Sequence, residues 1–222
     1  MNQLRRLFFT GVIVGFSAFA HAETTEMEKL LIDTTEIFGK MIREEKINKE
    51  LLENAKGVVI LNATGFGLII GGSGGDGILL ARTPNGWSGP CAFTTAKGSF
   101  GIRVGGSSND IVILLMNAGV VDRWAKGGHF TDAFANAAFG PNGATAVDAD
   151  MKKRDFNVYI MEKSGFDAGV GFGGFDVNIN NEFNANFYDQ VGIDGNDIVS
   201  GRVNVPAAKA GSLDRLYSLL KK

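Results

Sequence analysis

The sequence predicts an α+β fold: a single domain in which a strongly curved, glycine-rich antiparallel sheet or small barrel is flanked by N- and C-terminal helices. The first observation is the apolar, β-branched character of residues 55–82, 98–116 and 164–179, which glycines interrupt repeatedly. Glycine inside a strand usually marks a bulge, a bend or a close backbone approach, and its recurrence over several strands indicates a sheet that glycine kinks curl. The second observation is composition, because 31 of the 222 residues are glycine, about twice the average usage of ~7%.

The first 22 residues have the pattern of a secretory signal peptide. Arg5 and Arg6 form a positive n-region, LFFTGVIVGFSAFA is an apolar h-region, and Ala20-His21-Ala22 is a small-residue cleavage site. The alternative, a membrane anchor, is disfavoured because the apolar run is shorter than the ~20 residues that a spanning helix needs. No cysteine stands at the cleavage site for lipid attachment. We expect a mature domain of residues 23–222 that is periplasmic or secreted.

Charge and cysteine content limit the function classes. The precursor has 22 basic and 24 acidic residues, and removal of Arg5 and Arg6 leaves 20 against 24, a net charge of −4. This balance argues against nucleic acid as a partner and leaves room only for a local basic patch. The single Cys91 forms no internal disulfide, so the core alone holds the fold. We expect a buried, inert Cys91, because a catalytic thiol needs a histidine partner and only His129 remains after cleavage.

Two helices are predicted to open the mature domain. Residues 23–43 have apolar side chains at the i, i+3, i+4 spacing of one helix face, and Thr24 or Thr25 can cap them with Glu28 near the third helical position. A short helix follows over 48–54. The first helix either lies in a membrane interface or covers the sheet, and we favour the second because a curved sheet must bury a face. The basic residues beside its apolar face are Lys29, Lys40, Arg43, Lys46 and Lys49.

Strands follow the two helices. The first four are predicted at 57–61, 67–71, 77–82 and 87–97. The turn signal Thr83-Pro84-Asn85-Gly86 predicts that the third and fourth form a hairpin. Residues 99–105 and 110–116 have the pattern of another hairpin across 106–109.

The remaining chain mixes short helices with later strands. A helix is predicted over 120–126, and periodicity is weak over 129–150. The later predictions are strands at 156–163 and 166–177, a polar connection at 180–186, and short helices or turns at 187–191 and 196–200. Pro206 opens the last helix, at a position where proline is tolerated. Phe187 and Tyr188 are expected to be buried with Leu216 and Tyr217 of that helix.

Short phrases along the chain stand in a fixed order. They include AKGV at 55–58, GILLAR at 77–82, WSGP at 87–90, DIVIL at 110–114, GPNG at 140–143 and KSGF at 163–166. The C-terminal phrases are the most specific: NFY at 186–188, DIVSG at 197–201, PAA at 206–208 and LYSLL at 216–220. In order and spacing the chain resembles the SYLF domain family over nearly its whole mature length.

The resemblance implies a compact domain that binds lipids, which are phosphoinositides in eukaryotic members, and some of those members also bind actin. It implies no enzymatic activity. Many members carry Lys-Ala-Gly after the first strand, where this chain has Ala63-Thr64-Gly65, and Arg after Gly-Pro-x-Gly, where this chain has Ala144. Each departure removes a cation that can meet phosphate. Phosphoinositide specificity is therefore not expected here, and neither is actin binding by an exported bacterial protein.

Three other patterns favour structural roles. The run GGSGG at 71–75 lacks the following helix and the Gly-Lys-Ser/Thr of a phosphate loop, so a bend or turn is favoured. The acidic residues of 148–155 and 189–197 lack EF-hand spacing, and Asp194 and Asp197 are better explained as helix caps. His129 alone forms neither a metal set nor a triad. We expect no metal, no cofactor, no small-molecule substrate and no catalysis.

A lipid contact requires cations at one surface, each worth about 1 kcal/mol near anionic lipid. The densest basic run, 152–154, stands beside Phe156, an aromatic side chain that can enter a membrane interface. The alternative for this run is a solvated start of a strand. Phenylalanines of the glycine-bearing strands are expected in the core, or lining an acyl-chain cavity if the interior is unfilled. The candidate lipid-binding residues are Lys152, Lys153, Arg154, Phe156, Lys97 and Arg103.

The sequence thus favours an exported, non-enzymatic lipid-binding protein of the cell envelope, with an anionic phospholipid or an acyl chain as ligand. The alternative is a structural or protein-interaction module of the periplasm without a lipid ligand. An enzyme is the weakest hypothesis, because no nucleophile–base pair and no metal set can be assembled from these residues.

Overall fold

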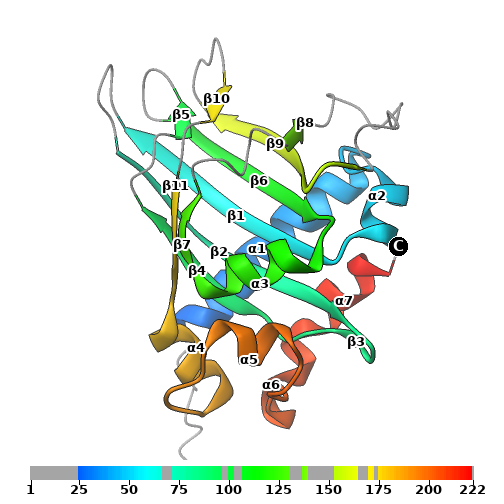
Figure 1. The fold of residues 1–222 in the computed structure, drawn as a ribbon, viewed down its shortest axis with the longest axis vertical. Helices are drawn as coiled ribbons and strands as arrows, with labels where there is room; N and C mark the ends of the chain where they lie inside the picture. The colour runs from blue at the N-terminus through cyan, green and yellow to red at the C-terminus, as the bar shows by residue number, and fades with distance from the viewer. Residues whose placement is uncertain are drawn as a thin grey trace, which may run out of the picture.

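The computed structural model describes residues 25–66, 72–96, 100–102, 107–130, 137–139, 153–164, 170–172 and 175–221. These residues form a single α+β domain whose sheet is strongly curled into a half-barrel, with helices packed around it (Figure 1). The predicted fold class is confirmed. The predicted signal peptide lies outside the described residues.

The helices are α1 (Glu26–Arg43), α2 (Lys49–Asn54), α3 (Ala118–Lys126), α4 (Asn181–Tyr188), α5 (Gly195–Val199), α6 (Ala207–Ala210) and α7 (Asp214–Leu220), with the 3-10 turn η3 (Gly211–Leu213) before α7. The first strands are β1 (Gly57–Phe66), β2 (Gly72–Thr83), β3 (Gly86–Trp87), β4 (Cys91–Ala96), β5 (Phe100–Ile102) and β6 (Ser107–Leu115). The later strands are β7 (Gly128–Phe130), β8 (Ala137–Phe139), β9 (Phe156–Ser164), β10 (Val170–Phe172) and β11 (Phe175–Ile179).

The main sheet has nine strands in the order β7-β11-β4-β2-β1-β6-β9-β8, with β3 added beside β2. Its pairs are antiparallel except β8–β9, which is parallel. Strands β5 and β10 form a separate antiparallel pair. The long strands β1, β2 and β6 lie at the centre of the sheet, and the sheet curves along them (Figure 1).

Glycine allows the central strands to approach each other closely. Gly77 of β2 pairs with Leu61 of β1 on one side and with Phe93 of β4 on the other. A methyl group at Gly77 would lie 2.6 Å from the carbonyl oxygen of Ile60, 2.7 Å from Leu61 Cβ and 2.7 Å from Phe93 Cζ. The buried Phe93 ring thus occupies the space of the missing side chain, as aromatic residues do when they cover strand glycines.

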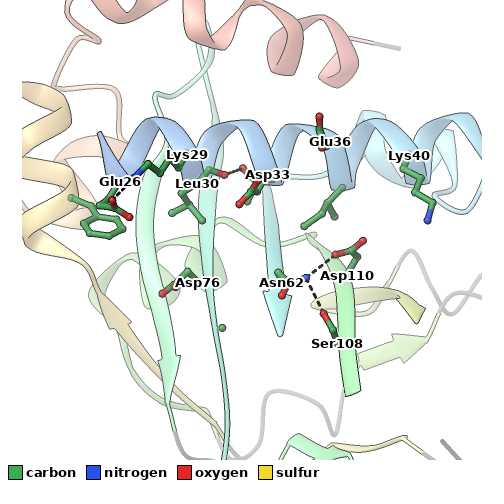
Figure 2. Close-up of a pocket in the computed structure, with 14 residues that line it drawn as sticks. Glu26, Lys29, Leu30, Asp33, Glu36, Lys40, Asn62, Asp76, Ser108 and Asp110 are labelled. Carbon is green, nitrogen blue, oxygen red and sulfur yellow. Dashed lines mark hydrogen bonds and ion pairs between the residues drawn. The ribbon is translucent and has the colours of Figure 1, made fainter. Parts of the chain in front are cut away.

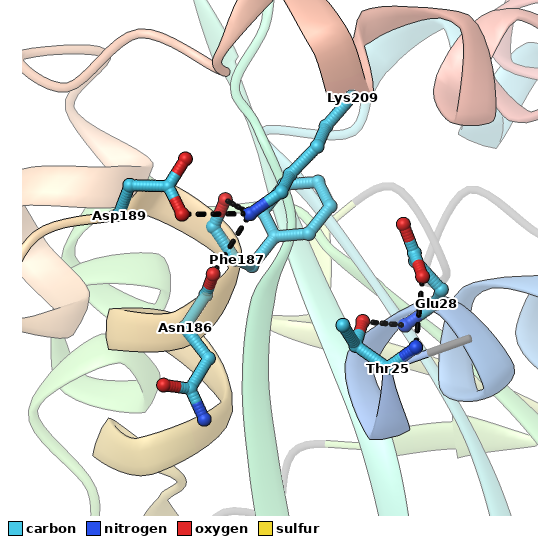
Figure 3. Close-up of polar contacts among 6 residues, drawn as sticks. All are labelled: Thr25, Glu28, Asn186, Phe187, Asp189 and Lys209. Atoms are coloured by element: carbon cyan, nitrogen blue, oxygen red, sulfur yellow. Dashed lines mark hydrogen bonds and ion pairs between the residues drawn. The ribbon is translucent and has the colours of Figure 1, made fainter. Parts of the chain in front are cut away.

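Helix α1 covers one face of the sheet, as predicted. Thr25 and Glu28 form a reciprocal capping box (Figure 3), with the Thr25 side chain accepting from Glu28 N at 3.2 Å. Leu31, Phe38 and Met41 are almost fully buried, and the helix packs against β1, β2 and β6. The apolar face of α1 is therefore used inside the domain, which rules out the alternative that this face lies in a membrane interface in this conformation. The predicted α2 is confirmed, with Asn48 as its N-cap.

Helix α3 covers the opposite face of the central strands. A methyl group at Gly57 of β1 would touch Val121 of α3. Trp124 of α3 is fully buried, and its ring centroid lies 5.5 Å from that of Phe93 and 5.3 Å from that of Phe130. This aromatic cluster fills the inside of the curl.

The C-terminal segment is joined to the sheet by two tyrosines. Phe187, Tyr188 and Leu216 are buried as predicted, and Tyr217 is half-buried. Tyr188 Oη donates to Pro90 O at 3.0 Å, and Tyr217 Oη donates to Ser88 O at 3.0 Å. Both hydroxyls thereby satisfy carbonyls of the segment between β3 and β4.

Lys209 connects α6 to the end of α4. Its Nζ donates to Asn186 O and Phe187 O at 2.8 Å each and to Asp189 Oδ1 at 3.0 Å (Figure 3). Carbonyls of the last helical turn have no partner within the helix. The ammonium group of Lys209, a residue distant in sequence, therefore caps the C-terminus of α4. A cation at this end also interacts favourably with the helix dipole.

The structure corrects several strand predictions. Residues 57–61 belong to one strand, β1, that continues to Phe66, and residues 72–75 of the GGSGG run lie in β2 instead of a bend. The predicted strand at 87–97 is divided into β3 and β4. The predicted hairpin of 99–105 with 110–116 is wrong, because β5 pairs with β10 and β6 already begins at Ser107. In β1, β2 and β6 neighbouring strands supply backbone partners, and this pairing overrides the weak intrinsic strand preference of glycine.

The predicted polar connection at 180–186 is instead the start of α4. Asn180 accepts from Phe183 N at 3.0 Å and so caps the helix. Asn184 is fully buried, accepts from Ala92 N at 2.8 Å and donates to Ala92 O at 3.2 Å. The side-chain amide of Asn184 therefore pairs with the backbone of β4 as a neighbouring strand would. Asn184 is polar because it makes these buried hydrogen bonds, not because it is exposed. The short β7, which overlaps the start of the weakly patterned 129–150 region, was also missed, since it depends on pairing with β11.

Candidate functional site

Two of the six predicted lipid-binding residues, Lys153 and Arg154, form a basic pair just before β9. Lys153 is exposed and Arg154 is half-buried, directly before the strand. The turn that holds them is tied to the end of β6, because Met116 N donates to Asp155 O at 3.0 Å. Lys152, Lys97 and Arg103 lie outside the described residues.

Phe156 is placed differently from the expectation. It is 3% exposed and, as the first residue of β9, pairs with Leu115 of β6 and Ala137 of β8. Side chains alternate between the two faces of a strand, and this position points into the core. A side chain buried in this way offers no surface to a membrane, so Phe156 is left out of the contact surface proposed below.

A second cationic pair lies where α1 meets α7. A methyl group at Gly39 would lie 3.4 Å from Arg43 Nη1 and 3.9 Å from Arg215 Nη2. The guanidinium groups of two exposed arginines thus lie near the same buried glycine, where α1 contacts α7. Arg43 was among the basic residues of the first helix, but Arg215 was missed, because no sequence signal places α7 beside α1.

A cleft of about 700 Å³ lies beside the contact of α1 with the sheet below it and is lined by both (Figure 2). Its floor is a row of polar side chains on three adjacent strands: Asp76 of β2 pairs with Asn62 of β1, which pairs with Asp110 of β6. Asn62 Nδ2 donates to Asp110 Oδ1 at 3.0 Å and lies 3.4 Å from Ser108 Oγ. The row was missed because it depends on register. Its sequence signal was a polar residue at one end of each apolar run: Asn62 after 57–61, Asp76 before 77–81 and Asp110 before 111–115.

The cleft is acidic. Five carboxylates and two ammonium groups line it, and one ammonium, that of Lys29, is paired with Glu26 at 2.7 Å. Asp110 is 1% exposed at the floor. Burial raises the pKa of Asp76 above its ordinary value, because a carboxylate loses hydration there.

Cys91 lies in the core, and His129 is paired with an aspartate. Cys91 is fully buried, as predicted, and burial raises its thiol pKa to about 12. His129 Nδ1 lies 2.7 Å from Asp176 Oδ1 in an exposed pair between β7 and β11. Among the residues that the structure describes, no three His, Cys, Asp or Glu side chains gather closely enough to hold a metal ion.

Asp194 caps α5 as predicted, accepting from Asp197 N at 2.8 Å. Asp197 itself forms an ion pair with Arg202 at 2.7 Å instead of capping a helix. Within the described part of the chain, every helix is too short or too polar to span a bilayer.

A curled sheet with helices on both faces, two cationic surfaces and one acidic cleft defines a binding module. The family model described as "Las17-binding protein actin regulator" matches residues 96–222, more than half of the chain. The chain therefore belongs to the Ysc84, or SYLF, family, as the resemblance predicted.

Curated relatives agree with this assignment. "SH3 domain-containing YSC84-like protein 1" of Rattus norvegicus is 31% identical over 204 residues, which are 90% of this chain and 60% of the relative, and the Homo sapiens protein is equally similar over 59% of its length. "LAS seventeen-binding protein 3" of Saccharomyces cerevisiae is 28% identical over 208 residues, 90% of this chain and 44% of the relative. The chain thus spans 60% or less of these relatives. Membership makes it a protein-interaction or lipid-binding module.

Proposed function

We propose that this chain is an exported, non-enzymatic lipid-binding protein whose ligand is an anionic phospholipid. The proposed precursor carries a signal peptide over residues 1–22, and the mature domain, 23–222, acts in the periplasm or after secretion. The support for export is the charged, apolar and small-residue order of the first 22 residues. The support for a lipid ligand is family membership together with the cationic surfaces described above.

The observation that carries the lipid proposal is the position of Lys153 and Arg154 at the start of β9, within the basic run 152–154 of the sequence. A mature net charge of −4 repels an anionic bilayer, so attraction must be local and short-range. Lys153 is exposed and Arg154 is half-buried, which suits cations that contact a headgroup phosphate while their stems pack on protein. The pair Arg43 and Arg215 offers a second place for a phosphate, because two guanidinium groups meet one anion well.

A protein-interaction role without a lipid ligand is the second candidate. The observation that favours it is the naming of the relatives, since the family description and the yeast relative both refer to Las17 binding. Under this alternative the curled sheet serves as a scaffold, and its partner is a protein of the compartment in which the chain resides. Vesicle binding separates the two candidates.

Flotation with anionic and with zwitterionic vesicles tests the lipid proposal. Replacement of Lys152, Lys153 and Arg154 by Ser should weaken binding to anionic vesicles by about 3 kcal/mol, on the order of a hundredfold, at about 1 kcal/mol per cation. Wild-type binding should fall as salt rises, because surface charges are screened. Arg43→Ser/Arg215→Ser measures the second pair in the same assay.

The control variant is Lys126→Ser/Arg202→Ser, which removes two cations from the end of α3 and from the segment after α5. It should bind almost as wild type does, because neither residue belongs to the proposed surfaces. Equal binding by wild type and the 152–154 variant would remove this patch from the mechanism. Absence of wild-type binding to anionic vesicles at low salt would favour the protein-interaction candidate.

A further inference from the structure

The acidic cleft under α1 has the size and the lining of a ligand site. Its volume of about 700 Å³ is within the range of ~300–1,000 Å³ typical of small-molecule pockets. Such pockets combine apolar walls with a few polar groups that fix the orientation of the ligand. Here Leu30 and Ile37 of α1 and Phe183 of α4 supply apolar surface, and the row on β2, β1 and β6 supplies the polar groups (Figure 2).

The spacing of the carboxylates determines which kind of cation fits the cleft. Asp76 and Asp110 flank Asn62 on the two neighbouring strands, so their Cα atoms are about 10 Å apart, two strand spacings of ~4.8 Å. In the described residues no three acidic or other metal-ligating side chains converge on one point. A point charge such as a divalent metal ion is therefore a poor match, whereas an extended molecule with several positive charges can meet both carboxylates.

We propose that the cleft between α1 and the Asp76–Asn62–Asp110 row binds an aliphatic polyamine. The ammonium groups contact Asp76 and Asp110 on the floor and Asp33 on the helix wall, and Asn62 contributes its side-chain carbonyl. The methylene chain between the ammonium groups packs on Leu30, Ile37 and Phe183.

The electrostatics of the cleft favour such a ligand. Five carboxylates against two ammonium groups leave the lining negative, and Glu26 already neutralises one of the two, Lys29. Burial raises the pKa of Asp76 through loss of hydration, so a positive charge beside this carboxylate would stabilise its ionised form. A bound ammonium supplies that charge, and its alkyl chain adds burial of apolar surface.

Isothermal titration of the purified protein with spermidine at constant ionic strength tests the proposal. Saturable binding is expected for spermidine, weaker binding for putrescine, and none at the same concentration for butylamine, which has one ammonium group. Asp76→Asn on the floor and Asp33→Asn on the helix wall each remove one charged contact and should raise the Kd about tenfold. Asp122→Asn is the matched control, an exposed aspartate of α3 on the other face of the sheet, and should leave the Kd unchanged.

Four results would overturn the proposal. Two are absence of saturable spermidine binding and equal affinity for spermidine and butylamine. The others are an equal loss of affinity in Asp122→Asn and Asp76→Asn, and competition by Mg²⁺ as effective as that by spermidine at equal ionic strength, which would indicate non-specific screening. Since the titration contains no lipid, its outcome is independent of vesicle flotation, and failure of either proposal leaves the other intact.

Discussion

Gly77→Ala tests whether close approach of the central strands depends on glycine. The added methyl group would meet three atoms at 2.6–2.7 Å: Ile60 O, Leu61 Cβ and Phe93 Cζ. Real Cβ atoms do not come so close, so the backbone or the Phe93 ring must move. Overpacking of this kind costs ~1–3 kcal/mol, and because a backbone carbonyl and a buried ring are both involved, we expect about 3 kcal/mol.

Thermal unfolding followed by circular dichroism measures this loss. For a domain of this size, about 3 kcal/mol corresponds to a decrease in Tm of about 6–12 °C. The control is Gly211→Ala, the same chemical change at a glycine with φ −61° and with no atom within 4 Å of the new methyl group. It should be neutral or stabilising by up to ~1 kcal/mol, since alanine restricts the unfolded chain. Equal melting temperatures for the two variants would refute the packing argument.

Three further predictions concern other parts of the fold. Leu216→Ala should cost ~2–5 kcal/mol in urea unfolding, because its side chain is fully buried; a loss below ~1 kcal/mol would mean that α7 is peripheral. Lys209→Met should cost ~1–3 kcal/mol by removing a charged donor from two carbonyls of α4, whereas Lys126→Met at an exposed site should leave stability unchanged. Cys91, with its pKa raised to about 12, should not react with a disulfide reagent at pH 8 in the folded protein and should react at once in guanidinium; rapid reaction in the native state would contradict its burial.

Local signals predicted the elements at the two ends of the chain. The Thr25–Glu28 capping box and the Asn48 cap are readable as short spacings, and the apolar stripe of α7 has a period that a helix alone explains. Such features depend on residues within one turn of each other. They are therefore visible before any tertiary contact is known.

Features that depend on pairing could not be predicted in this way. The amide of Asn184 pairs with Ala92, 92 positions earlier in the chain, so the polar sequence of α4 suggested a connection. The convergence of Arg43 with Arg215 and the row of Asp76, Asn62 and Asp110 depend on helix packing and on strand register. Phe156 is an aromatic residue beside a basic run, which suggested membrane contact. The alternation of side chains along β9 instead places Phe156 in the core.

Native mass spectrometry of the protein isolated from the cell envelope tests export and lipid binding together. We expect a polypeptide that begins at Glu23 and carries an additional mass that organic extraction identifies as an anionic phospholipid. A second preparation with residues 152–154 changed to Ser should carry less of that mass. The bare polypeptide as the sole species, or a chain that retains Met1, would contradict the proposal of an exported lipid-binding protein.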